Sequence, residues 1–234
     1  MSTWITVARY HLIQRLNFLV LPWAILAFAF IICLAIFGSL HASGIGTHGN
    51  HYYAGGIATI FVVWFIAGIQ TTSRSLSFAL ALGATRRAYY LGSITLGVTL
   101  AAVYGLGLAG LQAVERTTGG WGLRMHFFRV PYLLDGPWYL TWCTSLVGLA
   151  LLYCWGIWFG LVYRRWNLAG LLAFIATQIA AFTAGALAVT WTGGWHSLDR
   201  FFTAISAAGL TGFLAALAAA LIVGGLSTAR RLTV

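Results

Sequence analysis

Six long apolar runs dominate this sequence and set the main limit on what it can fold into. They cover residues 19–41, 55–72, 90–113, 138–162, 168–190 and 204–226. A helix needs about 20 mostly apolar residues to cross the hydrocarbon core of a bilayer. Only 7% of the residues are charged, whereas a typical soluble domain has about 25%, so much of the surface must face lipid. The sequence therefore predicts an all-α, polytopic membrane protein in which residues 1–234 form a single transmembrane domain with six transmembrane helices.

The charged residues predict the orientation of these helices. All basic residues are arginines. If both termini lie on one side, that side holds nine of them: Arg9, Arg15, Arg74, Arg86, Arg87, Arg164, Arg165, Arg230 and Arg231. The other side holds the remaining four and all three acids: Arg116, Arg124, Arg129, Arg200, Glu115, Asp135 and Asp199. Short cytoplasmic loops are enriched in arginine, so we expect both termini in the cytoplasm.

The arginines occur in small groups between apolar runs, which is the pattern of membrane proteins, and we expect no nucleic-acid partner. Abundant Ala, Gly, Arg and Trp without lysine is typical of a GC-rich bacterial genome. We therefore expect a multi-pass protein of the bacterial plasma membrane.

The N-terminal segment has two interpretations. In residues 2–17, Trp4, Ala8 and Leu12 share a helical face away from Arg9, which is typical of a helix lying on the membrane surface. The alternative is a cytoplasmic extension of the first span. Farther along, loop 73–89 is long enough for a short helix that Gly83 ends, and a tight basic connection is expected at 163–167.

Several kinds of chemistry are missing from the sequence. A phosphate-binding P-loop requires a lysine, and this chain has none. All three acids are expected in outer loops, so an acid-based proton relay within the membrane has no members. Ser145 lies in mid-span with no histidine at similar depth, which argues against a serine hydrolase. The outer histidines fit no rigid ligand spacing, and we expect neither a metal site nor enzymatic activity on this chain.

A few polar residues interrupt the apolar runs. They are Gln70, Thr71, Gln112, Thr177 and Gln178. Such side chains either line a translocation path or form hydrogen bonds between helices, and packing between helices is the more common role of any single one.

The inner loop after the second run carries a motif. Leu82-Gly83 is followed by Thr85-Arg86-Arg87 and then by the aromatic pair Tyr89-Tyr90. This segment resembles the corresponding loop of small, exporter-type bacterial ABC transporter permeases. The layout of the whole chain is also similar to theirs, with a surface N-terminal helix, six spans and both termini inside. The motif itself covers about 18 residues.

The resemblance implies that the loop forms a coupling helix that docks onto a separate ATPase subunit. The docking residues would be Phe78, Leu82, Thr85, Arg86 and Arg87. An apolar anchor beside guanidinium groups suits a groove with carboxylates. The alternative is that Arg86 and Arg87 only anchor the topology and that Phe78 packs on the membrane.

The resemblance also implies the partners. A cytoplasmic ABC ATPase subunit would hold ATP and magnesium, while this chain would carry no cofactor of its own. A second copy or a paralogous permease would complete the path, and membrane lipid would surround it. Tryptophans in the spans, such as Trp64, Trp142, Trp155 and Trp158, favour a hydrophobic or amphipathic cargo if they line the path rather than pack or face lipid. The alternative function is a membrane substrate-capture or sensor subunit without its own path.

Overall fold

Long helices make up almost all of the computed structural model, which describes residues 19–43, 52–81, 83, 85–130, 134 and 136–230. Five segments within this part are long and apolar enough to cross a membrane: Leu21–Ala42, Gly55–Ser73, Arg86–Thr117, Trp138–Trp191 and Ala207–Thr228. Their length and hydropathy confirm the all-α class and a membrane-embedded chain. The predicted helix over residues 2–17 lies outside the described residues.

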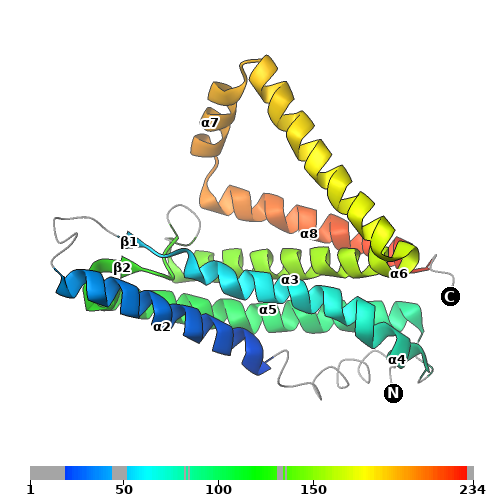
Figure 1. Ribbon diagram of the computed structural model, residues 1–234, viewed down its shortest axis with the longest axis horizontal. Coiled ribbons are helices and arrows are strands. Elements are labelled where there is room, and N and C mark those ends of the chain that lie inside the picture. Colours follow the sequence, from blue (N-terminus) through cyan, green and yellow to red (C-terminus); the bar gives the residue numbers. More distant parts are fainter. Residues whose placement is uncertain are drawn as a thin grey trace.

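Three helices and the first half of a fourth form a bundle along the long axis of the molecule (Figure 1). They are α2 (Leu21–Ala42), α3 (Ala58–Gln70), α5 (Arg86–Thr117) and α6 (Trp138–Trp191). The 3-10 turn η2 (Gly55–Ile57) leads into α3, and the π-helical turn η3 (Thr71–Ser75) continues it into the short α4 (Leu76–Ala81). This short helix, followed by Gly83 at φ 82°, confirms the expected helix in the inner loop.

Close backbone contact holds α3 against α6. A methyl group added to Gly68 would overlap the carbonyl oxygen of Tyr153, and one added to Gly156 would overlap that of Phe65. Because these two glycines lack side chains, the two helices cross with their backbones in contact, which is how small residues drive association in lipid.

A sharp bend divides α6. Its 54 residues cover two of the predicted spans, and a straight helix of that length would measure about 80 Å. Asn167 alone has non-helical angles, φ 54° and ψ −154°, and the chain turns there away from the bundle (Figure 1). The expected loop at 163–167 is therefore wrong, because residues 163–166 are helical and one residue makes the turn.

The chain beyond the bend forms an arm, residues 168–204, made of the second half of α6 and the short α7 (Trp195–Ala204). No residue of the arm is buried in this chain. The last helix, α8 (Ala207–Arg230), returns along the first half of α6, so that the arm and α8 outline a triangle (Figure 1). Hydrogen bonds that hold α8 there include those from Trp158 Nε1 to Leu221 O (3.0 Å) and from Tyr90 Oη to Ile222 O (2.9 Å).

Helix α2 is shifted along the bundle relative to α5. Its first turn meets the middle of α5, where the rings of Trp23 and Tyr104 lie 5.3 Å apart and Tyr104 Oη donates to Leu19 O at 3.4 Å. At the opposite end, the two-residue strands β1 (Tyr52–Tyr53) and β2 (Met125–His126) pair in parallel. The π-helical turn η4 (Gly120–Arg124) precedes β2.

Candidate functional site

One end of the bundle gathers the end of α3, η3, α4, the start of α5, the bend of α6 and the end of α8 (Figure 1). Arg86 and Arg87 open α5 there, and Arg164 and Arg165 precede the bend. We call this the arginine end. The predicted coupling motif lies here, so this end is the candidate site.

The start of α5 combines a good cap with an unfavourable charge. Thr85 is extended (φ −74°, ψ 147°), and its Oγ1 accepts a hydrogen bond from Ala88 N at 3.2 Å. Two arginines follow in the first turn, which has no acid. The helix dipole disfavours a positive charge at this position by about 0.3–1 kcal/mol. The stability of α5 therefore does not explain Arg86 and Arg87, which leaves docking and anchoring of the topology as the two reasons for them.

A series of buried polar contacts connects η3, α5 and α6 behind this turn. Tyr89 Oη donates to Thr71 O at 2.6 Å, and the hydroxyls of Thr71 and Tyr153 lie 3.2 Å apart. Tyr153 Oη also donates to Ser93 O at 3.2 Å. The series passes through η3, and single π-helical turns of this kind are frequent at functional sites. The end of α3 and the start of α5 are thereby fixed to the core of the bundle.

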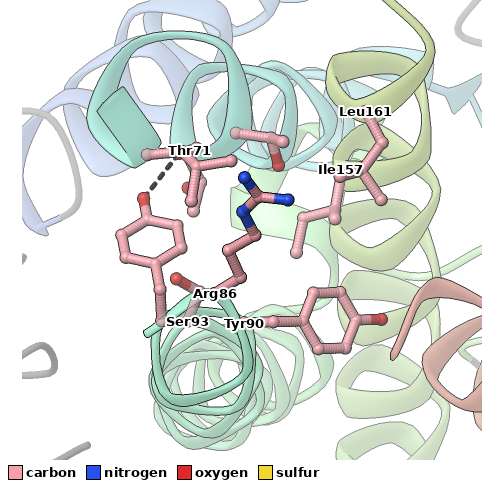
Figure 2. Close-up of a pocket in the computed structure, with 9 residues that line it drawn as sticks. Thr71, Arg86, Tyr90, Ser93, Ile157 and Leu161 are labelled. Carbon is pink, nitrogen blue, oxygen red and sulfur yellow. Dashed lines mark hydrogen bonds between the residues drawn. The ribbon is translucent and has the colours of Figure 1, made fainter. Parts of the chain in front are cut away.

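A small cavity lies between these polar contacts and Arg86. Its volume is about 20 Å³, which is room for about one water molecule. Figure 2 shows the half-buried Arg86 guanidinium pointing into it, toward Thr71 at the end of α3, with Ile157 opposite. The cavity is too small for a transported molecule.

The predicted docking residues therefore separate into groups. Arg87 is exposed and can reach a partner, whereas Arg86 faces inward. Thr85 is exposed but acts as the N-cap of α5. Phe78 lies in α4, and its side chain, like the whole of Leu82, lies outside the described residues.

The five predicted path residues do not meet within one chain. Gln70 and Thr71 lie where α3 ends, at the arginine end, whereas Gln112 lies near the opposite end of α5. Gln112 Nε2 donates to Leu134 O and so holds a loop. Thr177 and Gln178 lie on the arm. Thr177 Oγ1 donates to Ala173 O of its own helix at 2.8 Å, whereas Gln178 Nε2 is buried without a hydrogen-bond partner among the described residues.

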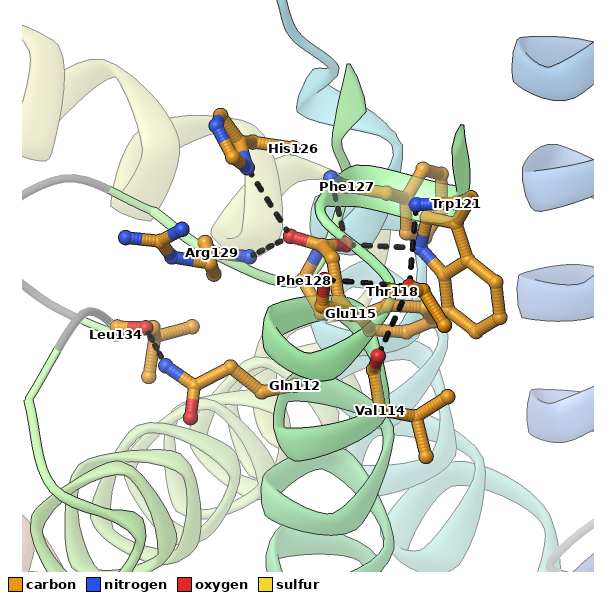
Figure 3. A network of polar contacts seen from close by, with 10 residues as sticks. All are labelled: Gln112, Val114, Glu115, Thr118, Trp121, His126, Phe127, Phe128, Arg129 and Leu134. Carbon is orange, nitrogen blue, oxygen red and sulfur yellow. Dashed lines mark hydrogen bonds and ion pairs between the residues drawn. The ribbon is translucent and has the colours of Figure 1, made fainter. Parts of the chain in front are cut away.

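A buried carboxylate organises the end of the bundle away from the arginine end. Glu115 is fully buried in α5, and its Oε2 accepts from Phe127 N (3.0 Å), Phe128 N (2.9 Å) and Trp121 Nε1 (3.1 Å). Its Oε1 accepts from Arg129 N at 3.2 Å, as the radial arrangement in Figure 3 shows. Charge-assisted hydrogen bonds of this kind are the strong ones, so this side chain holds residues 121–129 against the end of α5.

The expectation that Glu115 lies in an outer loop is wrong, because α5 continues to Thr117 and carries it. The spacing of Leu108, Gln112 and Glu115 was a signal that could have identified it. These residues recur at four and three positions, which places them on one helical face, and all three are buried.

An acid on the buried face near a helix end predicts that the loop after the helix folds over the acid and donates hydrogen bonds to it, because a buried carboxylate must be hydrogen-bonded.

Comparison of this chain with protein-family models, curated proteins and solved structures gives no match, so the resemblance carried by the inner loop stays a prediction from the sequence.

Proposed function

We propose that this chain is the transmembrane permease subunit of an ABC transporter, exporting a hydrophobic or amphipathic substrate with ATP hydrolysed by a separate subunit. The observation that carries the proposal is the geometry of the arginine end. A short helix, α4, precedes an exposed Arg87 that opens α5 against the helix dipole. An acidic groove on a cytoplasmic partner would satisfy this charge.

The proposed topology has six crossings, both termini in the cytoplasm and the arginine end facing it. Two features support it. The bend at Asn167 divides a helix too long for one crossing into two, each long enough for a bilayer. The described arginines of both inner connections then share one end of the bundle (Figure 1). A bacterial plasma membrane is the proposed location.

The proposed cargo rests on a row of aromatic rings. Phe65 of α3 contacts Phe159 of α6 at 5.2 Å between centroids, and Phe159 contacts Phe174 of the arm at 5.1 Å. Trp155 extends the row and is partly exposed. Trp64, in contrast, is fully buried between Tyr104 and Tyr153 and is a packing residue. An apolar row of this kind suits a hydrophobic molecule, and a second copy or a paralogue would complete the path.

The test is co-purification of the tagged chain in mild detergent from its native host. Wild type should bring down an ATPase subunit, recognised by its nucleotide-binding sequence in mass spectrometry. Arg87→Glu should lose it, because a carboxylate would then face the proposed acidic groove. Phe78→Ala should weaken it. Arg200→Glu, the same charge change on exposed α7, is the matched control and should retain the ATPase.

Arg86→Glu has a different expectation. Its side chain faces the small cavity, so a carboxylate there should disturb the polar contacts at Thr71 and lower stability as well as binding. An ATPase retained equally by wild type and Arg87→Glu would remove Arg87 from the interface. Absence of any ATPase from the wild-type sample, with another membrane protein in its place, would favour the alternative, a substrate-capture or sensor subunit.

A further inference from the structure

A second cavity lies at the arginine end, between the bend of α6 and the last turns of α8. Its volume is about 330 Å³, more than ten times that of the cavity beside Arg86. Arg165, Trp166, Trp158, Ser227 and Thr228 line it. This volume is in the range of small-ligand sites, and the walls combine one cation, two hydroxyls and apolar surface.

The charge in this cavity is uncompensated by the part of the chain that the structure describes. Arg165 is exposed, and its guanidinium carbon lies 4.8 Å from the centroid of the Trp166 ring. This contact orients the guanidinium without neutralising it. No described carboxylate lies within ion-pair distance of it. The cavity therefore suits an anion.

The hydroxyls add a second chemical requirement. Ser227 Oγ donates to Gly224 O at 2.7 Å, and Thr228 Oγ1 donates to the same carbonyl at 3.0 Å. With their hydrogens used in this way, both oxygens remain as acceptors. The ligand that matches carries a phosphate for Arg165 and hydroxyl donors beside it.

The apolar wall and the position of the cavity point to a lipid. Trp158 is held in place by its hydrogen bond to Leu221 O, and it presents its ring to the cavity. Trp166 is 54% exposed at the mouth. Tryptophan beside arginine at the end of a membrane helix is typical of the headgroup level of a bilayer. Basic pockets between helices at this level bind lipid headgroups.

We propose that this cavity binds the headgroup of an anionic glycerophospholipid, with the phosphate on Arg165 and headgroup hydroxyls on Ser227 and Thr228. A headgroup seated there would fasten α8 to the bend of α6, which are the two elements that support the arm. This inference requires only that the arginine end lies at the membrane surface, and it does not depend on an ATPase partner.

The backbone at the bend of α6 gives independent support for a binding site beside Trp166. Asn167, next to Trp166, has φ 54° with ψ −154°, a combination that only glycine adopts readily. Strained residues of this kind cluster at binding sites, where the surroundings hold them. The bend at Asn167 sets the direction in which the chain continues after Arg165 and Trp166.

The experiment is native mass spectrometry of the purified full chain with phosphatidylglycerol or phosphatidylcholine added at equal amounts. Wild type should retain one phosphatidylglycerol per chain and release phosphatidylcholine. Arg165→Gln should weaken retention by about tenfold, since it removes the only cation among the described residues that line the cavity. Arg87→Gln removes an exposed arginine from the same end outside the cavity, and it should stay within about twofold of wild type.

Two further variants and a competitor separate the contribution of the Arg165 charge from that of the two hydroxyls and from binding of free phosphate. Arg165→Lys should restore part of the retention, because a point charge remains without the bidentate geometry. Ser227→Ala with Thr228→Val should reduce the preference for phosphatidylglycerol over phosphatidic acid, which lacks the headgroup hydroxyls. Inorganic phosphate in large excess should not displace the lipid.

Three results would overturn the proposal. They are equal retention by Arg165→Gln and wild type, equal retention of phosphatidylcholine, and displacement by inorganic phosphate. The last would identify a site for free anions instead. A melting midpoint of lipid-free Arg165→Gln equal to that of wild type excludes misfolding as the cause of a loss.

Discussion

The two halves of α6 are both apolar and differ in packing. Both are long apolar segments of one helix that meet at Asn167. The first half contributes the glycine that touches the backbone of α3, and much of it is buried. The second half has no buried residue, and a methyl group added to its Gly185 would meet nothing within 4 Å. Hydropathy alone does not distinguish the halves.

This difference follows from the physics of lipid. Apolar side chains are as well solvated by lipid tails as by another helix, so hydrophobicity does not drive helix association there. Small residues and hydrogen bonds between helices do. The first half has both, because Gly156 approaches α3 and Thr144 bonds to α8. Thr177 of the arm donates only to a carbonyl of its own helix, and Thr190 bonds only within the arm, to Ala186 O and from Trp195 Nε1.

The largest expected difference is between substitution of an acid of the bundle and substitution of an acid of the arm. Glu115→Ala should lower the free energy of unfolding by more than about 3 kcal/mol, since it strands three backbone N–H groups and the Trp121 indole in a buried segment. Asp199→Ala, on exposed α7, should change it by less than about 0.5 kcal/mol. Unfolding by SDS, followed by tryptophan fluorescence, measures both.

Glu115→Gln sharpens this prediction. The amide keeps one acceptor oxygen but turns an N–H group toward a region that already consists of donors. We expect an intermediate loss, together with a change in the Trp121 emission. Equal stability of the alanine variant and wild type would show that the carboxylate does not fold the segment.

The next effect compares two glycines of α6. Gly156→Ala should lower the free energy of unfolding by about 2 kcal/mol, because the new methyl group must push α6 away from Phe65 of α3. Gly185→Ala makes the same change on the arm, where the space is open, and should be neutral or slightly stabilising. Both are read from the midpoint of thermal unfolding in detergent. An equal loss in both would contradict the contrast between the halves.

The sequence predicted the long helices because apolar runs and arginine groups are local signals. It also predicted the short helix before Gly83. It missed the length of α5, because Glu115 and Arg116 look like loop residues when the partners that bury the carboxylate are unknown.

The glycines show why the contacts between helices could not be predicted from the sequence. Gly110 has nothing within 4 Å of an added methyl group, whereas Gly68 and Gly156 cross each other's helices. Which small residue meets another helix depends on the rotation of both helices, which a single sequence does not encode locally. The separation of the path residues has the same cause. Gln112 and Thr71 both lie near the C-terminal ends of their helices, but the helices are antiparallel, so the two residues lie at opposite ends of the bundle.

A smaller effect is expected at the junction of the two halves. Asn167→Gly should raise the free energy of unfolding by about 1 kcal/mol, because glycine adopts φ 54° with ψ −154° without the cost of a side chain. Asn167→Ala should lower it, since alanine favours the straight helix and opposes the bend. A thermal shift in opposite directions for the two variants checks this. A gain in both would show that the asparagine is not strained.

The smallest expected effect concerns the hydrogen bond that joins the first half of α6 to α8. The hydroxyls of Thr144 and Thr211 lie 2.8 Å apart, and both residues are buried. Interhelical hydrogen bonds in membranes average about 0.6 kcal/mol. Thr144→Val, Thr211→Val and the double variant form a cycle, and we expect a coupling free energy of about that size in SDS unfolding.

The control for this cycle is Thr177→Val on the arm, whose hydroxyl bonds only within its own helix, so that pairing it with Thr211→Val should give no coupling. A coupling free energy equal to zero for the Thr144–Thr211 pair would mean that this hydrogen bond does not hold α8, which would leave the hydrogen bonds from Trp158 and Tyr90 and the apolar packing of α8 on the bundle. A lipid bound at the proposed headgroup site beside Trp158 would then contribute more to the stability of α8 on the bundle. Lipid removal should in that case lower the unfolding midpoint of wild type more than either valine substitution does.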